Sequence, residues 1–466
     1  MEDKNENSPD IENQEMLQDL SDQGKTEQLV EMMEELPTMD VAEFMEEKSL
    51  EETANYLKQL DPADQGRIFS DFSIDRQIDL FHSLDRRTFA QIFGQMYSDI
   101  RADLYQELAK EEQIELLPYL DKAVREDVII LSAYPPETAG GIMTTNFATI
   151  FADMTISQAL AKIRIDAPTK DMIYYIYVVD HSMVMKGLVT LKDLVMNIPD
   201  MRVDELLNEF FVYAEVNEDR ESVAQKIEKY DLAAIPVLNS LNQLVGVVTH
   251  EEAIDVIREE HTEDLEKFMG IMPSENDDEY MNTSSFHHFK KRVVWLVSLA
   301  AIGIISGMII NEYQGVLEHF IILAMYMPMM AATGGNTGSQ AATVVIRALS
   351  LGEVTDDEWL KILYKEMKIS FMLSVCVAAL TFFKIAYLSF NSHLPAGFTL
   401  PYIGLTISFA IAIQVITSAL LGAGLPLIVR RLGGDPAVVA SPAITTIVDI
   451  TGLLIYFTVA SATLGI

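Results

Sequence analysis

Cysteine is almost absent from this chain of 466 residues. The single cysteine, Cys376, cannot form an intramolecular disulfide or a cysteine metal cluster. Histidine is also rare, and after Arg292 only His319 and His393 occur. A zinc site of cysteine and histidine is therefore excluded there. No His-Glu-x-x-His pair is present, which an intramembrane metalloprotease would need.

Basic residues are few compared with acidic ones. Asp and Glu number 70 against 33 Lys and Arg, for a net charge of −37. Residues 1–292 hold 61 of the acids and 26 of the bases, and so carry −35 of that charge. Such a region would repel nucleic acid and anionic lipid, whereas it favours metal cations or simple solubility. We expect no nucleic-acid partner.

The N-terminus lacks the features of a signal peptide. It reads MEDKNENSPDIENQEM, which has neither a basic start nor an apolar core. We therefore expect the acidic region to stay in the cytoplasm.

Long apolar runs fill the rest of the chain, and a bilayer core needs about 20 such residues per helix. We predict five spans in contact with membrane lipid, which places the two termini on opposite sides. The runs are Val293–Ile310, Val316–Ile346, Phe371–Leu388, Leu400–Val429 and Ala437–Leu464.

Lys and Arg near the span ends predict the orientation. With the acidic region inside, only Lys384 lies at an outer end. We expect a multi-pass protein of the cell (plasma) membrane with a cytoplasmic N-terminus and an external C-terminus. The inner ends carry Lys290, Lys291, Arg292, Arg347, Lys361, Lys365, Lys368, Arg430 and Arg431.

An internal repeat marks the middle of the chain. Residues 173–195 (IYYIYVVDHSMVMKGLVTLKDLV) recur as residues 232–254 (LAAIPVLNSLNQLVGVVTHEEAI), an offset of 59. Each copy predicts strand, turn, strand and helix. The pair resembles tandem cystathionine-β-synthase (CBS) domains, which usually regulate and seldom catalyse.

The preceding segment predicts short stacked helices, because Leu-Asp pairs at Leu60, Leu84 and Leu120 place a helix N-cap after each turn. The expected fold is a multidomain membrane protein with an all-α N-terminal domain, α/β tandem CBS domains and a five-helix α transmembrane domain. The expected boundaries are a disordered acidic tail (1–28), a helical N domain (29–135), CBS domains 1 (136–198) and 2 (199–258), a connecting helix and linker (259–290) and the transmembrane domain (291–466).

One carboxylate, Asp449, lies within the last apolar run. A charge there costs several kcal/mol unless it faces a polar path. Ser441, Thr445 and Thr446 add oxygens nearby, and Thr445 shares a helix face with Asp449. The alternative is a carboxyl that is protonated or held by hydrogen bonds between helices.

The second run contains helix-weakening residues, namely Pro328, Gly334 and Gly335. They predict a broken helix, which survives in a membrane only within protein or along a wet cavity. The alternative is close helix packing through small residues. Polar residues follow at Asn336, Thr337, Ser339 and Gln340.

One carboxylate with amide and hydroxyl oxygens and no lining cation suits a partly hydrated divalent cation such as Mg²⁺. The same lining disfavours an anion channel. It does not separate channel from carrier, or Mg²⁺ from Mn²⁺, Co²⁺ or Ca²⁺. A further alternative is a metal sensor that conducts no ions.

An acidic helix face follows the second CBS copy. Glu252, Asp255, Glu259 and Glu263 are spaced three, four and four residues apart. Like charges at this spacing destabilise a helix, so a bound cation would help. The alternative is a solvated acidic face. Glu260 and Asp264 lie beside this face, and Asp99 with Asp103 form a weaker pair of the same kind.

The strings MPMMAATGGNTGSQAATVVIRAL and GGDPAVVASPAITTIVDITGLLIYF, together with the order of the parts, resemble the MgtE family of magnesium channels. The resemblance covers nearly the whole chain. It implies a non-enzymatic homodimer with the pore on the two-fold axis. It implies that Asp449 of both subunits selects hydrated Mg²⁺. The residue pattern adds Gly335, Asn336, Thr445 and Thr446 to the candidate pore residues.

The resemblance also implies that cytoplasmic Mg²⁺ closes the pore. Some family members bind ATP between the CBS modules, and Tyr175 and Asp193 stand at matching places, although no glycine-rich phosphate loop is present. The long N-terminal tail and His261, where alanine is usual, depart from the family pattern. The matching regulatory acids are Glu221, Asp231, Glu252, Asp255, Glu260, Glu263, Asp264 and Asp435.

Overall fold

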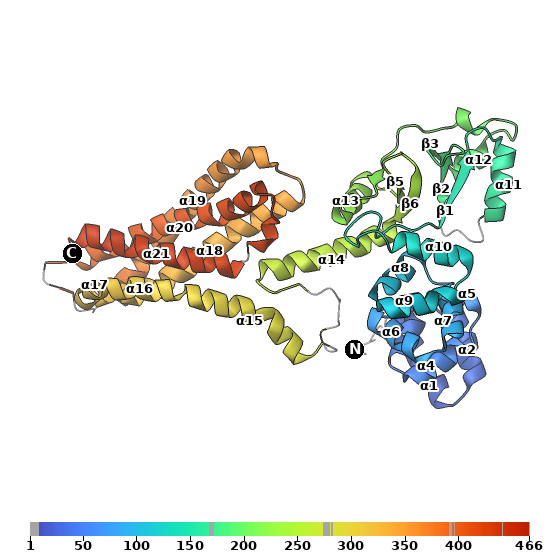
Figure 1. The fold of residues 1–466 in the computed structure, drawn as a ribbon. Coiled ribbons are helices and arrows are strands. Elements are labelled where there is room, and N and C mark those ends of the chain that lie inside the picture. The colour runs from blue at the N-terminus through green and yellow to red at the C-terminus, as the bar shows by residue number, and fades with distance from the viewer. Residues whose placement is uncertain are drawn as a thin grey trace, which may run out of the picture. The chain divides into compact units, whose positions relative to one another are not determined.

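The computed structural model describes residues 9–166, 172–273, 280, 283–390, 394–395, 397–439 and 441–465. The chain forms two compact units, Met1–Arg258 and Glu259–Ile466 (Figure 1).

The first unit begins with short helices packed around one apolar core. Phe69, Phe81, Phe89 and Phe93 are fully buried there, and Phe89 meets both Phe69 and Phe81 edge to face. The turns predicted at the Leu-Asp pairs are present, and Asp85 accepts hydrogen bonds from two backbone N–H groups of the next helix. The helices are α1 (Pro9–Asp22), α2 (Thr26–Glu35), α3 (Thr38–Glu46), α4 (Leu50–Leu57), α5 (Pro62–Ser70), α6 (Ile74–Ser83), α7 (Arg86–Phe93), α8 (Ser98–Glu107), α9 (Lys110–Leu116) and α10 (Lys122–Leu131).

The acidic tail predicted for residues 1–28 is wrong from Pro9 onward. Residues 9–22 form α1, and Leu17 is fully buried in the core of the helical domain. Asn13 also donates a 2.6 Å hydrogen bond to the Asp40 carboxylate of α3. These contacts outweigh the polar composition on which the tail was predicted. Residues 1–8 lie outside the described part of the chain.

The CBS repeat appears as two three-stranded sheets of the same topology. In each, the first strand is parallel to the second, and the second is antiparallel to the third. Val178 pairs with Gly187 in one sheet and Val237 with Gly246 in the other, so the 59-residue offset holds in the strand register. The elements are β1 (Phe147–Phe151), α11 (Ile156–Asp166), β2 (Met172–Val179), β3 (Met185–Thr190), α12 (Leu191–Met196), β4 (Ala214–Glu215), α13 (Arg220–Tyr230), β5 (Ala234–Leu238), β6 (Leu244–Thr249) and α14 (His250–Phe268).

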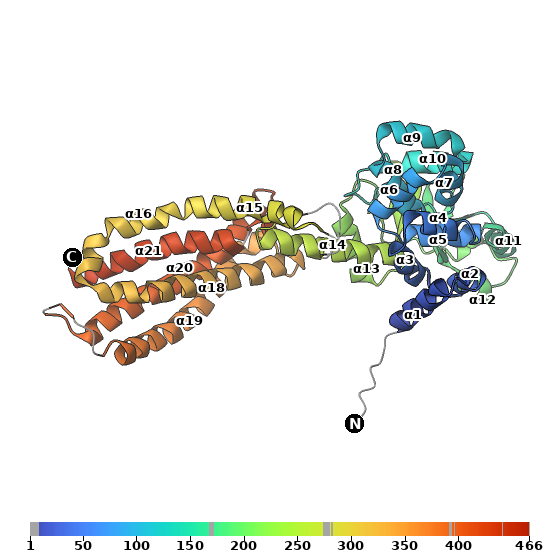
Figure 2. The same cartoon turned by 90° about the horizontal axis from the view of Figure 1, so that it is seen from below.

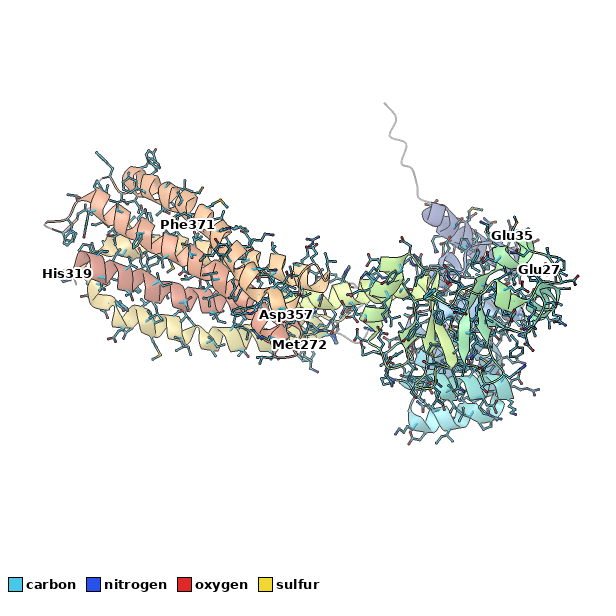
Figure 3. The ribbon with its side chains drawn as sticks, turned by 90° about the horizontal axis from the view of Figure 1, so that it is seen from above. Glu27, Glu35, Met272, His319, Asp357 and Phe371 are labelled. Carbon is cyan, nitrogen blue, oxygen red and sulfur yellow. The ribbon has the colours of Figure 1, made fainter. Side chains whose placement is uncertain are left out.

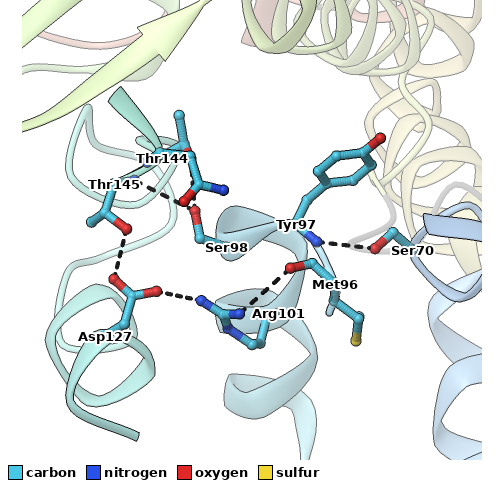
Figure 4. Close-up of polar contacts among 9 residues, drawn as sticks. Ser70, Met96, Tyr97, Ser98, Arg101, Asp127, Thr144 and Thr145 are labelled. Carbon is cyan, nitrogen blue, oxygen red and sulfur yellow. Dashed lines mark hydrogen bonds and ion pairs between the residues drawn. The ribbon is translucent and has the colours of Figure 1, made fainter. Parts of the chain in front are cut away.

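A polar network joins the helical domain to Thr144 and Thr145, in the segment that leads into the CBS pair (Figure 4). The hydroxyls of Ser98 on α8 and Thr144 hydrogen-bond at 2.7 Å. Thr145 donates to Asp127 of α10 at 2.7 Å, and Asp127 also pairs with the buried guanidinium of Arg101. This network positions α8 against the CBS pair.

The second unit is a bundle of long helices (Figures 1 and 2). Large apolar side chains lie exposed on it, among them Phe371 of α19 (Figure 3), as expected of a lipid-facing surface. The helices are α15 (Ser285–Ile302), α16 (Ile304–Glu312), α17 (Gln314–His319), α18 (Ile321–Ser350), α19 (Trp359–Leu388), α20 (Leu400–Arg431) and α21 (Ser441–Leu464).

Four segments of the described chain are long and apolar enough to cross a membrane: Ser285–Glu312, Trp359–Leu388, Leu400–Arg431 and Ser441–Leu464. The remaining predicted span coincides with α18, a helix of 30 residues that contains the polar string TGGNTGSQ. The count of five spans therefore stays a prediction.

The predicted break in the second span is wrong, because α18 is continuous through Pro328 and the glycine pair. The glycines instead permit close packing. A Cβ atom on Gly422 of α20 would lie 2.0 Å from the carbonyl oxygen of Gly338 on α18. The alternative of packing through small residues is therefore correct at this crossing.

Candidate functional site

Asp449 lies near the middle of α21, with its side chain partly buried. Its Oδ1 atom is buried and has no hydrogen-bond partner within the described residues. An unpaired carboxylate oxygen in apolar surroundings is costly. The alternative in which hydrogen bonds between helices hold the carboxylate therefore finds no support at Oδ1.

α18 approaches α21 one turn before Asp449. A Cβ atom on Gly335 would lie 3.0 Å from Cγ2 of Thr445, and Ser441 donates to Ser339 across the two helices at 2.9 Å. The Thr445 and Thr446 hydroxyls donate to carbonyl oxygens of their own helix. Their hydroxyl oxygens can still accept hydrogen bonds.

The neighbouring face of α18 is polar and exposed in the single chain. Asn336, Gln340 and Thr343 follow one another at helical spacing, and all three are exposed. The structure thus brings Gly335 against Thr445, one turn before Asp449, and places Asn336 on the exposed side of α18.

Several buried polar residues in α19 and α20 were not singled out from the sequence, and two of them carry a carboxyl or an amide group. Glu366 of α19 is only 7% exposed and Gln414 of α20 is 0% exposed. Glu366 was overlooked because α19 begins at Trp359, well before the predicted Phe371. A glutamine in an apolar run was the available signal for Gln414.

Acidic side chains from two domains meet in the first unit. Asp99 and Asp103 on α8 lie near Glu252 and Asp255 on α14, and the carboxyls of Asp99 and Glu252 hydrogen-bond to each other. Burial raises the pKa of both carboxyls, and for Glu252 the nearby acids raise it further. The sequence analysis treated the acidic face of α14 and the Asp99–Asp103 pair as separate groups, whereas the fold brings them into one cluster.

The second unit holds another acidic group, centred on a lysine. The Lys267 amino group lies 2.9 Å from Glu263 and 3.0 Å from Asp435. Burial opposes its charge, but hydrogen bonds to these two acids hold its pKa above the usual range. Burial, followed by the charge of Asp435, raises the pKa of Asp264. The sequence analysis did not identify Lys267. Its amino group occupies the position between Glu263 and Asp435 where a metal ion was predicted.

The other predicted regulatory acids are dispersed. Glu221 lies in the first turn of α13, whereas Asp231 ends that helix with a left-handed backbone, so the two are about 15 Å apart along the axis. Asp255 pairs with Arg258 at 2.7 Å, and Glu260 also has an interaction partner. Within the described ranges, no three His, Cys, Asp or Glu side chains are arranged to hold a metal ion.

The two residues proposed for nucleotide binding have structural partners. Asp193 accepts from the Thr190 hydroxyl and backbone in a capping box that starts α12, and Tyr175 of β2 pairs with Thr190 of β3. A hollow of about 490 Å³ lies elsewhere on the second CBS domain and contains neither residue. It is lined by Phe211, Val212, Tyr213, Glu215, Asn217, Glu218 and Lys226.

A curated relative from Thermus thermophilus, the magnesium transporter MgtE, is 33% identical over 448 residues, which cover 95% of this chain and 97% of the relative. The chain belongs to the MgtE family. Family models match residues 36–137 as the MgtE intracellular N domain, 139–200 and 203–259 as CBS domains, and 327–459 as the MgtE divalent cation transporter.

Two further similarities extend this finding. The magnesium transporter MgtE of Bacillus subtilis is 33% identical over 347 residues, which cover 74% of each chain. The crystal structure of the soluble part of a magnesium transporter matches with a TM-score of 0.51 and 28% identity, covering 54% of this chain and 99% of that one. The present MgtE chain thus shares the N domain, CBS pair and membrane part of its family.

Proposed function

We propose that this MgtE protein is a homodimeric Mg²⁺-selective channel or transporter for magnesium uptake across the cell membrane. The observation that carries the proposal is the carboxylate of Asp449, which has a buried, unpartnered oxygen in the middle of an apolar helix. A transporter of this kind performs no covalent chemistry, so the chain is not an enzyme.

In this mechanism, Mg²⁺ is the substrate. Mg²⁺ dehydrates reluctantly and keeps several water molecules when it binds protein oxygens. The Asp449 charge would attract the ion, while the hydroxyl oxygens of Thr445 and Thr446 accept hydrogen bonds from its water shell. The absence of a side chain at Gly335 lets α18 approach Thr445 closely.

The exposed polar face of α18 supports a second subunit at this position. Asn336 and Gln340 would be costly against lipid, whereas they are suited to a water-filled path between two chains. A homodimer would also bring two Asp449 carboxylates to one path.

Substitution of Asp449 tests the transport proposal. Asp449→Asn keeps the shape of the side chain and removes its charge, so Mg²⁺ influx into proteoliposomes should fall to background while the protein still assembles. Flux equal to that of the parent would overturn the pore assignment. The same assay with Mn²⁺, Co²⁺ and Ca²⁺ decides between magnesium and another divalent cation.

Cytoplasmic Mg²⁺ would close the pore by binding between acidic surfaces. Burial and then the charges of nearby acids raise the pKa of Glu252, which supports this role because a cation relieves the same repulsion as a proton. Since no complete metal site exists within the described single chain, binding would need a partner subunit or a rearrangement.

Adenine nucleotide binding to the CBS pair is a separate proposal that rests on Tyr175 and Asp193. Calorimetry of the purified protein with ATP tests it, and Asp193→Ala should weaken any binding. The absence of heat with ATP would remove the nucleotide from the mechanism.

A further inference from the structure

Gln414 is a polar side chain in the interior of the membrane unit. It lies midway along α20 and is 0% exposed. A buried amide is costly unless it makes hydrogen bonds. Its Nε2 atom donates to the backbone carbonyl of Val448 on α21 at 3.0 Å, while its Oε1 has no partner in the part of the chain that is described.

Two glycines make room for this amide. A Cβ atom on Gly334 of α18 would lie 2.4 Å from Nε2 of Gln414, and a Cβ atom on Gly452 of α21 would lie 2.3 Å from the same nitrogen. Any larger residue at either position would displace the amide. The side chain of Gln414 therefore occupies a slot between α18 and α21 that only glycine permits.

The hydrogen bond falls one residue before Asp449. Because Val448 and Asp449 share a helical turn, rotating or sliding α21 would separate the Val448 carbonyl from the amide. A backbone carbonyl has two lone pairs, so it can accept this bond in addition to its helical one. The Thr451 hydroxyl lies 3.1 Å from the same oxygen and 3.0 Å from the Ile447 carbonyl, which gives the hydroxyl another acceptor. The bond thus links the orientation of the Asp449 turn to α20.

We propose that Gln414 is a positioning residue that holds α21 in the rotation and height at which Asp449 meets the ion. This inference rests on the proposed role of Asp449. Gln414 would therefore influence ion affinity and the discrimination between divalent cations, in addition to its contribution to helix packing. Partners that orient a metal ligand typically change metal affinity about 10- to 100-fold when they are removed.

The test uses Gln414→Met, which keeps the length of the side chain and removes the donor. The matched control is Ile411→Met, one turn earlier on α20 and also 0% exposed. In proteoliposomes, Gln414→Met should raise the half-saturating Mg²⁺ concentration at least about tenfold and lower the Mg²⁺-to-Ca²⁺ flux ratio. Ile411→Met should leave both unchanged. Parent-like values for Gln414→Met, or equal shifts in the two variants, would overturn the inference.

A second pair of variants covers the case in which Gln414→Met fails to assemble. Gly452→Ala displaces the amide and should produce the same shift in half-saturation and flux ratio. In the Gln414→Ala background the amide is gone, so adding Gly452→Ala should cause no further shift. Additive effects would overturn the proposed link.

The outcome for Asp449→Asn separates the two proposals. If that variant transports normally, the pore assignment fails whatever Gln414 does. If Asp449→Asn is inactive and Gln414→Met behaves as the parent does, only the positioning role fails.

Discussion

Glu252 is a single residue that lowers the folding stability of the protein when no metal is bound. Its carboxyl shares a hydrogen bond with that of Asp99, and burial raises the pKa of both groups. The charges of Asp99, Asp103 and Asp255 raise the pKa of Glu252 further. The native state therefore binds more protons than the unfolded state between the ordinary and the raised pKa values. In that interval stability falls as the pH rises, because the sign of the slope follows the difference in bound protons.

We therefore expect Glu252→Gln to stabilise α8 and α14 in EDTA at pH 7.5, where Glu252 is most costly. Hydrogen-exchange protection of the two helices should rise, after correction for the intrinsic pH dependence of exchange. The gain should shrink as the pH falls through the raised pKa toward the ordinary value of 4.5. Glu251→Gln, at an exposed neighbour, is the control. A gain independent of pH would contradict the assigned repulsion.

At the scale of an element, the crossing of α18 and α20 depends on Gly422. A methyl group there would meet the backbone of Gly338, which cannot move aside as a side chain can. Gly422→Ala should therefore destabilise the membrane unit by about 1–3 kcal/mol and reduce Mg²⁺ flux. Melting temperature in detergent measures the first effect and proteoliposomes the second.

Gly424→Ala is the matched control on the same helix, because its nearest neighbour outside α20 would be Leu363 at 3.9 Å. This variant should melt and transport as the parent does. Equal losses from the two substitutions would show that helix propensity is responsible, rather than the crossing.

Helix α1 offers a second test at this scale. Leu17 is 0% exposed, so Leu17→Ala should cost about 2–5 kcal/mol of stability in the helical domain. Met16→Ala, at a side chain that is 43% exposed, should cost much less. Chemical denaturation of the two variants compares them. No loss for Leu17→Ala would mean that residues 9–22 do not pack on the core.

At the scale of the whole molecule, the distribution of Lys and Arg predicts its orientation. In a Cys376→Ala background, a single cysteine at Ser284 should be labelled only from the cytoplasmic side, and one added after Ile466 only from outside. Membrane-impermeant maleimide on intact cells and inverted vesicles measures this. Labelling of both sites from one face would rule out an odd number of spans.

Charge is also the basis of the proposed gating. Two chains bring a formal charge of −35 each from residues 1–292 close together in a homodimer. Mg²⁺ bound between facing acids would reduce that repulsion and compact the cytoplasmic part, and a ligand shifts such an equilibrium only through its preference for one state. Replacing Glu252, Asp255, Glu260 and Glu263 by their amides should raise the Mg²⁺ concentration needed for closure and remove Mg²⁺ protection from protease.

The control for this prediction neutralises the same number of exposed acids elsewhere, at Glu27, Glu31, Glu35 and Glu51. This variant should close at the Mg²⁺ concentration of the parent. If the two variants close alike, net charge rather than a specific surface governs the response.

Local pattern alone predicted much of this architecture. Apolar run length predicted four helices that are long enough to cross a membrane, and the 59-residue repeat predicted two sheets in the same register. The rarity of a carboxylate in lipid singled out Asp449, whose role in the pore stays a proposal. These features follow from the immediate surroundings of each residue, because burial and helix or strand periodicity are already visible in neighbouring positions. Composition failed at α1, since a few buried side chains outweighed a polar average.

Only the tertiary structure decided which distant residues meet. Asp99 joins Glu252, Lys267 joins Asp435 across 168 positions, and Gln414 reaches the turn that holds Asp449. The continuity of α18 was decided in the same way, because its glycines pack against α20 and α21. Contacts between segments depend on how whole helices pack. The periodicity within one segment shows which face is buried, but it does not identify the segment that packs against that face.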